Sequence, residues 1–267
     1  MITIPYFEDK SRLFDWLVEN KTLLINQKKS EIKHADAFLH LCPLFNDKGV
    51  EVKSEAIPAT VDKIKVRSII NTTKLFDSHQ DVHIDGLWNK SLKESKDNYL
   101  VNQHNFKYEG IISDNVHAFA KHITWAELGF PGYEGTTQAL VYDSVISKAE
   151  SPFMFEKYRA GKVKQHSVGM RYLKLEMAIN DKRYEKEYAV WEKYFDIIVN
   201  KSDAEEAGVF WPVLEAKNIE GSAVLMGSNH ITPTQSVSAA KYGTEIDINE
   251  PLVSTQKEIK FINPNFY

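Results

Sequence analysis

The sequence contains a single cysteine, Cys42, among its 267 residues. One thiol cannot form an internal disulfide, and it lacks the spaced partner ligands that a structural zinc site requires. The sequence therefore predicts a protein that folds in a reducing cytoplasm.

Long hydrophobic runs are also missing, since no stretch of about 18 consecutive apolar residues, the length that spans a bilayer, occurs. The first six residues include Pro5 and lack the basic start and apolar stretch of a signal peptide. Neither membrane insertion nor secretion is predicted.

A strong excess of one charge is absent as well. The net charge is −4 and no dense run of Lys and Arg occurs, so binding to nucleic acid or to an acidic membrane surface is not expected. The 12 Gly and 9 Pro are too few for a disordered or fibrous chain, and the 43% apolar fraction is typical of globular proteins. We expect one core domain with additions.

Several motifs of common enzyme classes do not occur. The sequence has no G-x-S-x-G elbow, no P-loop and no G-x-G-x-x-G. It therefore gives no support to an α/β-hydrolase, to nucleotide hydrolysis or to dinucleotide redox chemistry.

The N-terminal part is predicted to be helical. Between residues 7 and 40, apolar side chains recur mostly at helical spacing with Lys and Glu between them, which predicts one or two amphipathic helices. The turn-rich residues 46–49 and Pro58 then predict a boundary near residues 46–60.

The core is predicted to begin with a strand at residues 63–70, where apolar and polar side chains alternate. Residues 116–125 and 165–177 predict two further strands, with two helices between the strands of this region. One of these helices has Ser151 placed to cap it, Pro152 at its first position and Gly161 just past its end.

The C-terminal third predicts one helix and two strands. Aromatic and apolar side chains at spacings of three or four predict an amphipathic packing helix over residues 181–200. Residues 209–214 and 222–226 are predicted to be separate strands, and the stretch from Gln235 onward is expected to be loose or cleavable.

Most of the nine histidines fall in this core region, so a metal site has to be considered. His79, His83, His104, His117, His122 and His166 are among them. No H-E-x-x-H motif occurs, and His117 and His122 are five residues apart on an expected strand, which points them to opposite faces. A metal-dependent hydrolase that uses the region of His79, His83 and His122 stays an alternative, and it predicts bound zinc.

Three separated segments each hold one candidate for a catalytic triad: His104 in residues 100–105, Ser167 in residues 165–170 and Glu220 in residues 219–224. A serine hydroxyl is a weak nucleophile and needs an imidazole to remove its proton, while a carboxylate can hold the imidazole in one tautomer. Gly169, two residues after the serine, would let another backbone come close and leave peptide N–H groups free to face an oxyanion.

Each candidate also has an ordinary structural interpretation. His104 can be a hydrogen-bonded structural histidine, Ser167 a plain strand serine and Glu220 a solvated surface residue, because buried polar groups are routinely just hydrogen-bonded. The residues alone therefore leave both interpretations open.

Taken in order, the segments resemble the prohead proteases of tailed bacteriophages, whose fold is shared with the herpesvirus assemblin proteases. The resemblance begins at residues 65–70 and 77–88, which are similar to the opening strand and to the D-x-x-x-D-x-(hydrophobic)-x-x-G-(aromatic) segment of that family. Asn102-Gln103-His104-Asn105 looks like its catalytic histidine segment, and Ser167-Val168-Gly169-Met170 like its serine segment. Glu220 begins a stretch similar to its E-x-S-x-V segment.

The resemblance covers residues 61–237, and two departures accompany it. Residues 227–229, Gly-Ser-Asn, stand where the family usually has a Pro-Ala-Asn-like stretch, and residues 175–214 are longer than expected between the serine and the third residue. The resemblance implies His104 as base, Ser167 as nucleophile and Glu220 as the third triad member, with no cofactor and no metal.

The family also implies an α+β fold: a small, mostly antiparallel β-barrel surrounded by helices, as in assemblin. We expect a helical N-terminal extension (residues 1–55), a protease core (56–240) and a C-terminal tail (241–267). Phage scaffold and major capsid proteins are the expected substrates and partners, and a homo-oligomer inside the procapsid in the host cytoplasm is the expected setting. We expect the enzyme to cut itself as well. The helical segment at residues 7–40 or the tail after Gln235 is expected to act as a targeting or scaffold segment that is removed during maturation. The alternative is a protease-fold scaffold or capsid component without catalysis.

Overall fold

The computed structural model describes residues 3–32, 53–54 and 57–240. The expected boundary at residues 46–60 falls largely outside this part of the chain. Cys42, the end of the predicted N-terminal helical region and the tail at 241–267 also lie outside it.

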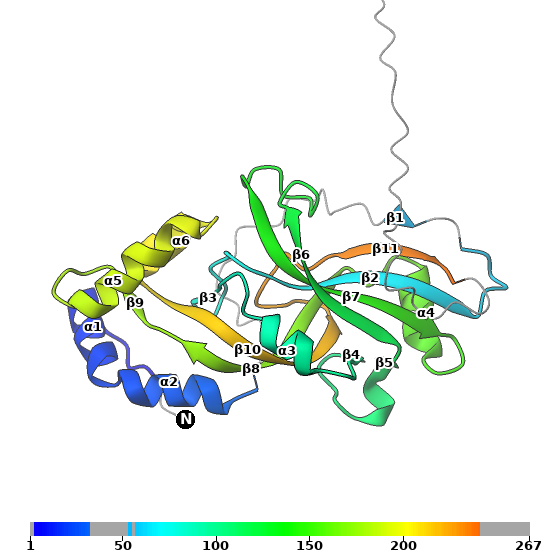
Figure 1. The fold of residues 1–267 in the computed structure, drawn as a ribbon, viewed down its shortest axis with the longest axis horizontal. Helices are drawn as coiled ribbons and strands as arrows, with labels where there is room; N and C mark the ends of the chain where they lie inside the picture. Colours follow the sequence, from blue (N-terminus) through cyan, green and yellow to red (C-terminus); the bar gives the residue numbers. More distant parts are fainter. Residues whose placement is uncertain (1–2, 33–52, 55–56, 241–267) are drawn as a thin grey trace, which may run out of the picture.

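The described residues form six α-helices, two 3₁₀ helices and eleven strands (Figure 1). The helices are α1 (Lys10–Glu19), α2 (Lys21–Ser30), α3 (Asn89–Glu94), η1 (Tyr108–Gly110), α4 (Pro152–Arg159), α5 (Glu185–Tyr194), η2 (Phe195–Ile197) and α6 (Lys201–Ala207). The strands are β1 (Lys53–Ser54), β2 (Lys63–Thr72), β3 (Asp81–His83), β4 (Leu100–Asn102), β5 (Ile111–Ser113), β6 (Val116–Thr124), β7 (Thr136–Ser147), β8 (Gln165–Leu175), β9 (Ala178–Ile179), β10 (Val209–Val224) and β11 (Thr234–Ala239).

The strands are organised in two sheets. The first has the order β1-β11-β2-β7-β6, and the second has the order β3-β10-β4-β5, with β8 and β9 also paired to β10. The long pairs β2–β7, β6–β7 and β8–β10 are antiparallel, whereas the short strands β3 and β4 join β10 in parallel.

The fold is α+β, as the sequence predicted, but the expected closed barrel does not form among the described residues. The two sheets meet at one corner, where Gln165 forms an isolated bridge with Pro233 and the backbone N–H of Ile69 donates to the Pro233 carbonyl. Within the described ranges, strands β6 and β1 have a paired neighbour on one side only. Because these edges stay unpaired with the second sheet, the sheets pack face to face without closing.

The hydrophobic core lies between the two sheets and continues under the helices. Its main cluster joins buried side chains of β2, β7, β8 and β10 with α4, whose Phe155 and Tyr158 are fully buried. Helix α4 begins and ends as predicted, with Pro152 in its first turn and Gly161 in a left-handed conformation after it, although the Ser151 side chain makes no cap bond.

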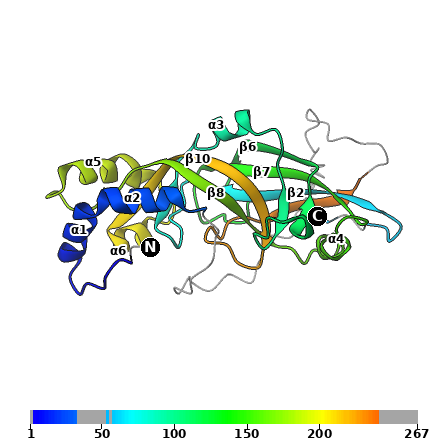
Figure 2. The same cartoon turned by 90° about the horizontal axis from the view of Figure 1, so that it is seen from below.

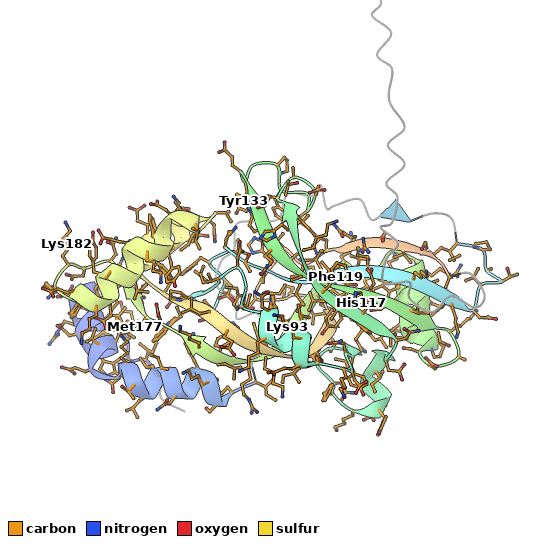
Figure 3. All side chains as sticks on the ribbon, in the orientation of Figure 1. Lys93, His117, Phe119, Tyr133, Met177 and Lys182 are labelled. Carbon is orange, nitrogen blue, oxygen red and sulfur yellow. The ribbon has the colours of Figure 1, made fainter. Side chains whose placement is uncertain are left out.

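The N-terminal helices pack against this core. Phe14, Leu17 and Leu24 are buried in the main cluster, and Phe14 sits against Gly208, where a Cβ atom would come within 2.9 Å of the phenyl ring. Figure 2 shows α2 running along β8, which it contacts. Met177, between β8 and β9, is fully buried at this helical end of the molecule (Figure 3). Loss of the segment that holds α1 and α2 would therefore expose core surface.

The packing of α1 gives a first prediction. Phe14→Ala is expected to lower the free energy of unfolding by about 3–5 kcal/mol, because it removes a buried ring and leaves a cavity. The matched change Leu23→Ala, at a largely exposed position of α2, is expected to stay within about 0.5 kcal/mol of the wild type. Urea denaturation followed by circular dichroism measures both, and equal midpoints for the two variants would show that α1 is not part of the cooperative unit.

Three predicted elements differ from the observed ones. The helix predicted over 181–200 is shorter: α5 covers Glu185–Tyr194 and is followed by η2, although Trp191 and Phe195 do stack in a packing cluster. The two strands predicted at 209–214 and 222–226 are one strand, β10, which is irregular in between. The stretch from Gln235 is not loose at its start, because β11 pairs with β2 there.

No helix in the described part of the chain is long and apolar enough to cross a membrane.

Candidate active site

The structure brings His104 and Glu220 into direct contact. His104 Nδ1 lies 2.6 Å from Glu220 Oε1, and both side chains are buried or nearly so, with exposed fractions of 10% and 1%. His104 follows β4, and β4 pairs in parallel with β10 so that Leu100 is opposite Gly221. The register places Asn102 opposite Ala223, and the turn at Gln103 and His104 then brings the imidazole to Glu220. The two residues in contact are 116 positions apart in the sequence.

The backbone at His104 adopts an unusual conformation. Gln103 and His104 have φ angles of 51° and 56°, in the left-handed region that non-glycine residues seldom adopt. Two hydrogen bonds to β10 hold this turn: the N–H of Gln103 donates to the Ala223 carbonyl at 3.0 Å, and the N–H of His104 donates to Ser222 Oγ at 2.7 Å. Backbone strain of this kind persists only where the surroundings fix it, and it often occurs at functional sites.

Ser167 lies on the same face of the β8–β10 pair as Glu220. Strand β8 places Ser167 opposite Ser222 and Gly169 opposite Glu220, and residues two apart on a strand share a face. Ser222 is also the residue that accepts the backbone N–H of His104. The three predicted triad members therefore converge on one region of this face.

The Ser167 hydroxyl makes no hydrogen bond with the described residues. Its Oγ is buried, and the residue is only 3% exposed. A buried hydroxyl without a partner costs about 1–3 kcal/mol, so such a group is worth an explanation. The structure thus shows the contact between the imidazole and the carboxylate, but no hydrogen bond between Ser167 and His104.

Gly169 has a different role from the one expected of it. A Cβ atom built at Gly169 would lie 2.1 Å from Glu220 Oε1, so the group that comes close is the Glu220 side chain and not another backbone. Only glycine at this position leaves room for the Glu220 carboxylate in the place where it contacts His104. The expectation of a close backbone approach was wrong, and the role of the peptide N–H groups near Gly169 stays a prediction.

His166 is next to Ser167 but faces the opposite side of β8. Its Nδ1 donates to the Thr232 carbonyl at 3.2 Å, and its Nε2 accepts from the Tyr158 hydroxyl at 2.9 Å. Burial lowers the pKa of His166 to about 4. Both ring nitrogens are occupied and the ring is neutral, so His166 is not available as the base for Ser167.

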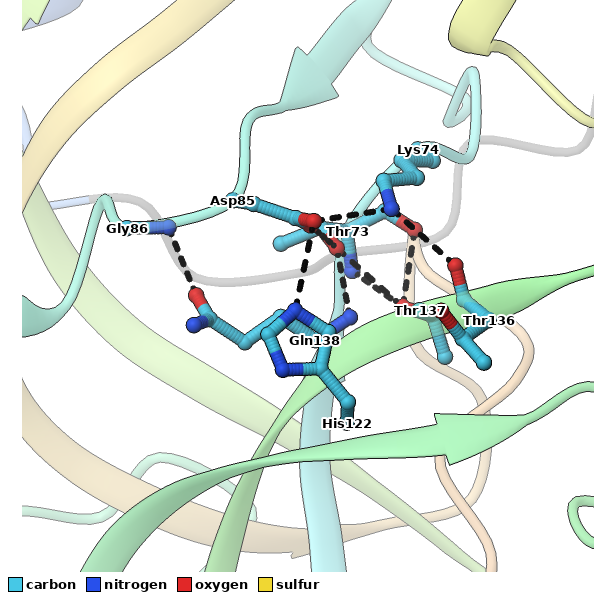
Figure 4. A network of polar contacts seen from close by, with 8 residues as sticks. All are labelled: Thr73, Lys74, Asp85, Gly86, His122, Thr136, Thr137 and Gln138. Carbon is cyan, nitrogen blue, oxygen red and sulfur yellow. Dashed lines mark hydrogen bonds and ion pairs between the residues drawn. The ribbon is translucent and has the colours of Figure 1, made fainter.

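The histidines proposed for a metal site have other partners. His83 is buried and hydrogen-bonded to Asn71 and Tyr172. His122 Nε2 lies 3.4 Å from Asp85 Oδ2, in the network of Figure 4. Among residues 3–32, 53–54 and 57–240, no group of three or more His, Cys, Asp or Glu side chains is arranged to hold a metal ion.

Figure 4 shows that Asp85 is the centre of that network, which also contains Lys74 and Thr73. Lys74 Nζ lies 2.8 Å from Asp85 Oδ2, and the Thr73 hydroxyl donates to Asp85 Oδ1 at 2.5 Å. Partial burial alone would raise the pKa of Asp85, but the hydrogen bonds from Lys74 and Thr73 outweigh it and lower the pKa. The network joins the end of β2 to β6 and β7, which makes its evident role structural.

A small pocket adjoins Ser167. Its lining residues come from β2, the β3 region, β8 and the loop after β10: Ile70, Asn71, His79, His83, Ser167, Val168, Met170, Tyr172, Ser228 and Asn229. No sequence pattern predicted a role at the site for Asn71 or Tyr172. For Asn229 a signal was present, because residues 227–229 were part of the family resemblance.

Comparisons of the chain with protein-family models, with curated proteins and with solved structures give no match.

Proposed function

We propose that this chain is a serine endopeptidase in which Ser167 is the nucleophile, His104 the general base and Glu220 the residue that orients the imidazole. The observation that carries the proposal is the 2.6 Å contact between His104 Nδ1 and Glu220 Oε1, on the strand face where the Ser167 hydroxyl is buried without a hydrogen bond. A carboxylate on Nδ1 leaves Nε2 as the nitrogen that takes a proton, which is the arrangement a serine nucleophile needs.

The reaction follows from these roles. As Ser167 Oγ attacks the peptide carbonyl carbon, His104 Nε2 accepts the hydroxyl proton, and Glu220 stabilises the imidazolium that forms. His104 then gives the proton to the amide nitrogen, the C–N bond breaks and an acyl-enzyme is left on Ser167. A water molecule, deprotonated by His104, attacks the ester carbonyl, the C–O bond to Ser167 breaks, and His104 returns the proton to Ser167 Oγ as the acid is released. The hydrogen bond between Ser167 and His104 has to form in this cycle, and catalytic hydrogen bonds often tighten only when substrate binds.

The substrate class in this proposal comes from the resemblance to phage prohead proteases. On that basis the enzyme cleaves scaffold and major capsid proteins, and also itself, within the procapsid in the host cytoplasm, where it acts as a homo-oligomer. The same resemblance implies that the α+β architecture is a variant of the assemblin fold. Two features of this chain support the proposal: the order of the segments that hold His104, Ser167 and Glu220, and the contact between His104 and Glu220.

A catalytically inactive scaffold or capsid component of the same fold is the second candidate. It is favoured by the absence of a hydrogen bond between Ser167 and His104 and by the 3% exposure of Ser167. A structural protein would have no need to expose that hydroxyl to a substrate.

A fluorophosphonate probe distinguishes the two candidates, because it reacts only with an activated serine. We expect one adduct when the probe is added to cells that co-express the chain with its capsid and scaffold proteins. Peptide mass mapping is expected to place the adduct in the tryptic peptide of residues 165–171, and His104→Ala is expected to abolish it. An unlabelled chain, or labelling that survives His104→Ala, would favour the structural role.

A further inference from the structure

A buried ion pair links the N-terminal helices to the core, close to the pocket that adjoins Ser167. Lys28, in the last turn of α2, has its Nζ 2.5 Å from Asp81 Oδ1 and 5.1 Å from the centre of the Trp211 ring. The Asp81 side chain has no exposed surface. A charge this deeply buried requires a compensating charge or several hydrogen bonds.

From Asp81 a chain of hydrogen bonds continues into the pocket. The Tyr172 hydroxyl donates to Asp81 Oδ2 at 2.7 Å, and its oxygen lies 3.3 Å from His83 Nε2. Asn71 Nδ2 lies 3.0 Å from His83 Nδ1. Since an amide nitrogen only donates, Nδ1 is the acceptor and Nε2 carries the proton that is donated to Tyr172. Each group in the chain thus fixes the orientation of the next.

The chain ends in the loop between β10 and β11. Asn229 Nδ2 donates to Asn71 Oδ1 at 3.2 Å and to the Thr72 carbonyl at 2.9 Å. Asn229 Oδ1 accepts the backbone N–H of Ile231 at 3.1 Å, which closes the loop on itself. The Asn229 side chain therefore fixes the first part of the loop that lines the pocket beside Ser167, while Thr232 fixes its end through hydrogen bonds with His166.

The charges around Asp81 make the ammonium group of Lys28 important to this network. Burial, and next the charge of Asp81, raise the pKa of Asp77 to about 6, while His83 and Lys28 act in the other direction. Burial lowers the pKa of His83, which disfavours its charged form. Lys28 brings a positive charge into direct contact with Asp81.

We propose that Lys28 is a positioning residue for the pocket beside Ser167: docking of α2 through the Lys28–Asp81 ion pair holds Tyr172, His83, Asn71 and Asn229 in place. The helical extension is then a working part of the molecule, and undocking of α2 disorders the loop at residues 227–232. The effect on cleavage rests on the proposed function, whereas the effect on the loop does not.

The test uses the full chain and the change Lys28→Met, which keeps the aliphatic stem and removes the charge. Its matched control is Lys29→Met, in the same helical turn, because Lys29 makes no ion pair with any described residue. Tyr172→Phe deletes one hydroxyl from the middle of the chain and leaves the ion pair intact. Lys28→Arg restores a cation.

Hydrogen exchange of the peptide covering residues 226–233 is the first readout. We expect exchange to become about tenfold faster or more in Lys28→Met and in Tyr172→Phe, with little change in Lys29→Met and recovery in Lys28→Arg. If Lys28→Met does not fold, Tyr172→Phe alone decides. Exchange in the loop that equals the Lys29→Met control would overturn the proposal, whether or not the protein cleaves peptides.

Peptide cleavage is the second readout. On the proposed function, Lys28→Met is expected to lower kcat/KM by about tenfold or more, chiefly through a higher KM, because the change loosens the loop beside Ser167 and leaves the contact between His104 and Glu220 in place. If the wild type cleaves no peptide but the loop of Lys28→Met still exchanges faster than that of the wild type, the protease function is refuted and the role of Lys28 stands. An active Lys28→Met variant with wild-type KM would refute the link to the pocket.

Discussion

Ser167→Ala is expected to reduce cleavage by about 10⁴–10⁶-fold, because the nucleophile and the base of a triad act as a unit. The alanine removes the oxygen that forms the acyl-enzyme and leaves the His104–Glu220 contact in place. Co-expression of the wild type or the variant with its capsid and scaffold proteins, with every chain followed by intact mass, measures the effect. The wild type is expected to give trimmed products, and Ser167→Ala is expected to leave all chains at full length.

Ser144→Ala provides the matched control for this change. Ser144 is also a buried strand serine, and its Oγ also makes no hydrogen bond with the described residues, but it lies on β7 and not on the β8–β10 pair. We expect it to process its substrates like the wild type. If Ser167→Ala and the wild type give the same masses, the chain is a structural component; if Ser144→Ala is as inactive as Ser167→Ala, the loss reflects disturbed packing and not missing chemistry.

Local patterns predicted those parts of the fold that neighbouring residues determine. The alternation at residues 63–70 corresponds to β2, and Pro152 with Gly161 marks the ends of α4. Strand β10 was split in two because its side-chain pattern changes phase. Register shifts between Val213 and Glu215, Glu215 and Ala216, and Asn218 and Glu220 interrupt the period-two alternation on which a strand prediction depends.

Other elements depend on pairing between distant residues. Strand β7, which the sequence analysis did not predict, lies between β2 and β6 and is buried along most of its length. Its sequence shows neither a clean period-two alternation nor a continuous apolar run, because Asp143 and Ser144 interrupt the apolar residues. Strand β11 is polar in composition, and its pairing with β2 and β1 gives it its structure. Such contacts have no signature within the segment itself.

The candidate site shows the same division. The types and order of His104, Ser167 and Glu220 were available from the sequence, but the 2.6 Å contact between His104 and Glu220 depends on the parallel register of β4 and β10. The pair Lys28–Asp81 had no local signal at all, because a lysine in the last turn of an amphipathic helix is ordinarily a solvated residue. A buried partner 53 positions away becomes visible only when the chain is folded.

Gly169→Ala is expected to reduce cleavage on the order of 10³–10⁴-fold, which approaches the effect of misplacing the carboxylate of a serine triad. The added Cβ would lie 2.1 Å from Glu220 Oε1 and 2.7 Å from its carboxyl carbon, so the Glu220 side chain has to leave its present position. His104 then loses the group that holds its tautomer and stabilises its charged form. The measurement is kcat/KM on a peptide taken from an observed cleavage site, with the loss expected in kcat.

Two further variants separate this cause from general damage to β8. Gly132→Ala adds the same methyl group at a position where nothing lies within 4 Å, and it is expected to be fully active. Glu220→Gln keeps the shape of the side chain and removes its charge, so it is expected to show a comparable loss of kcat without a steric conflict at Gly169. If Gly169→Ala is inactive while Glu220→Gln works like the wild type, the added methyl group impairs activity by disturbing strand β8. Glu220 is then not the third triad member. If both keep wild-type kcat, the contact between His104 and Glu220 is structural only.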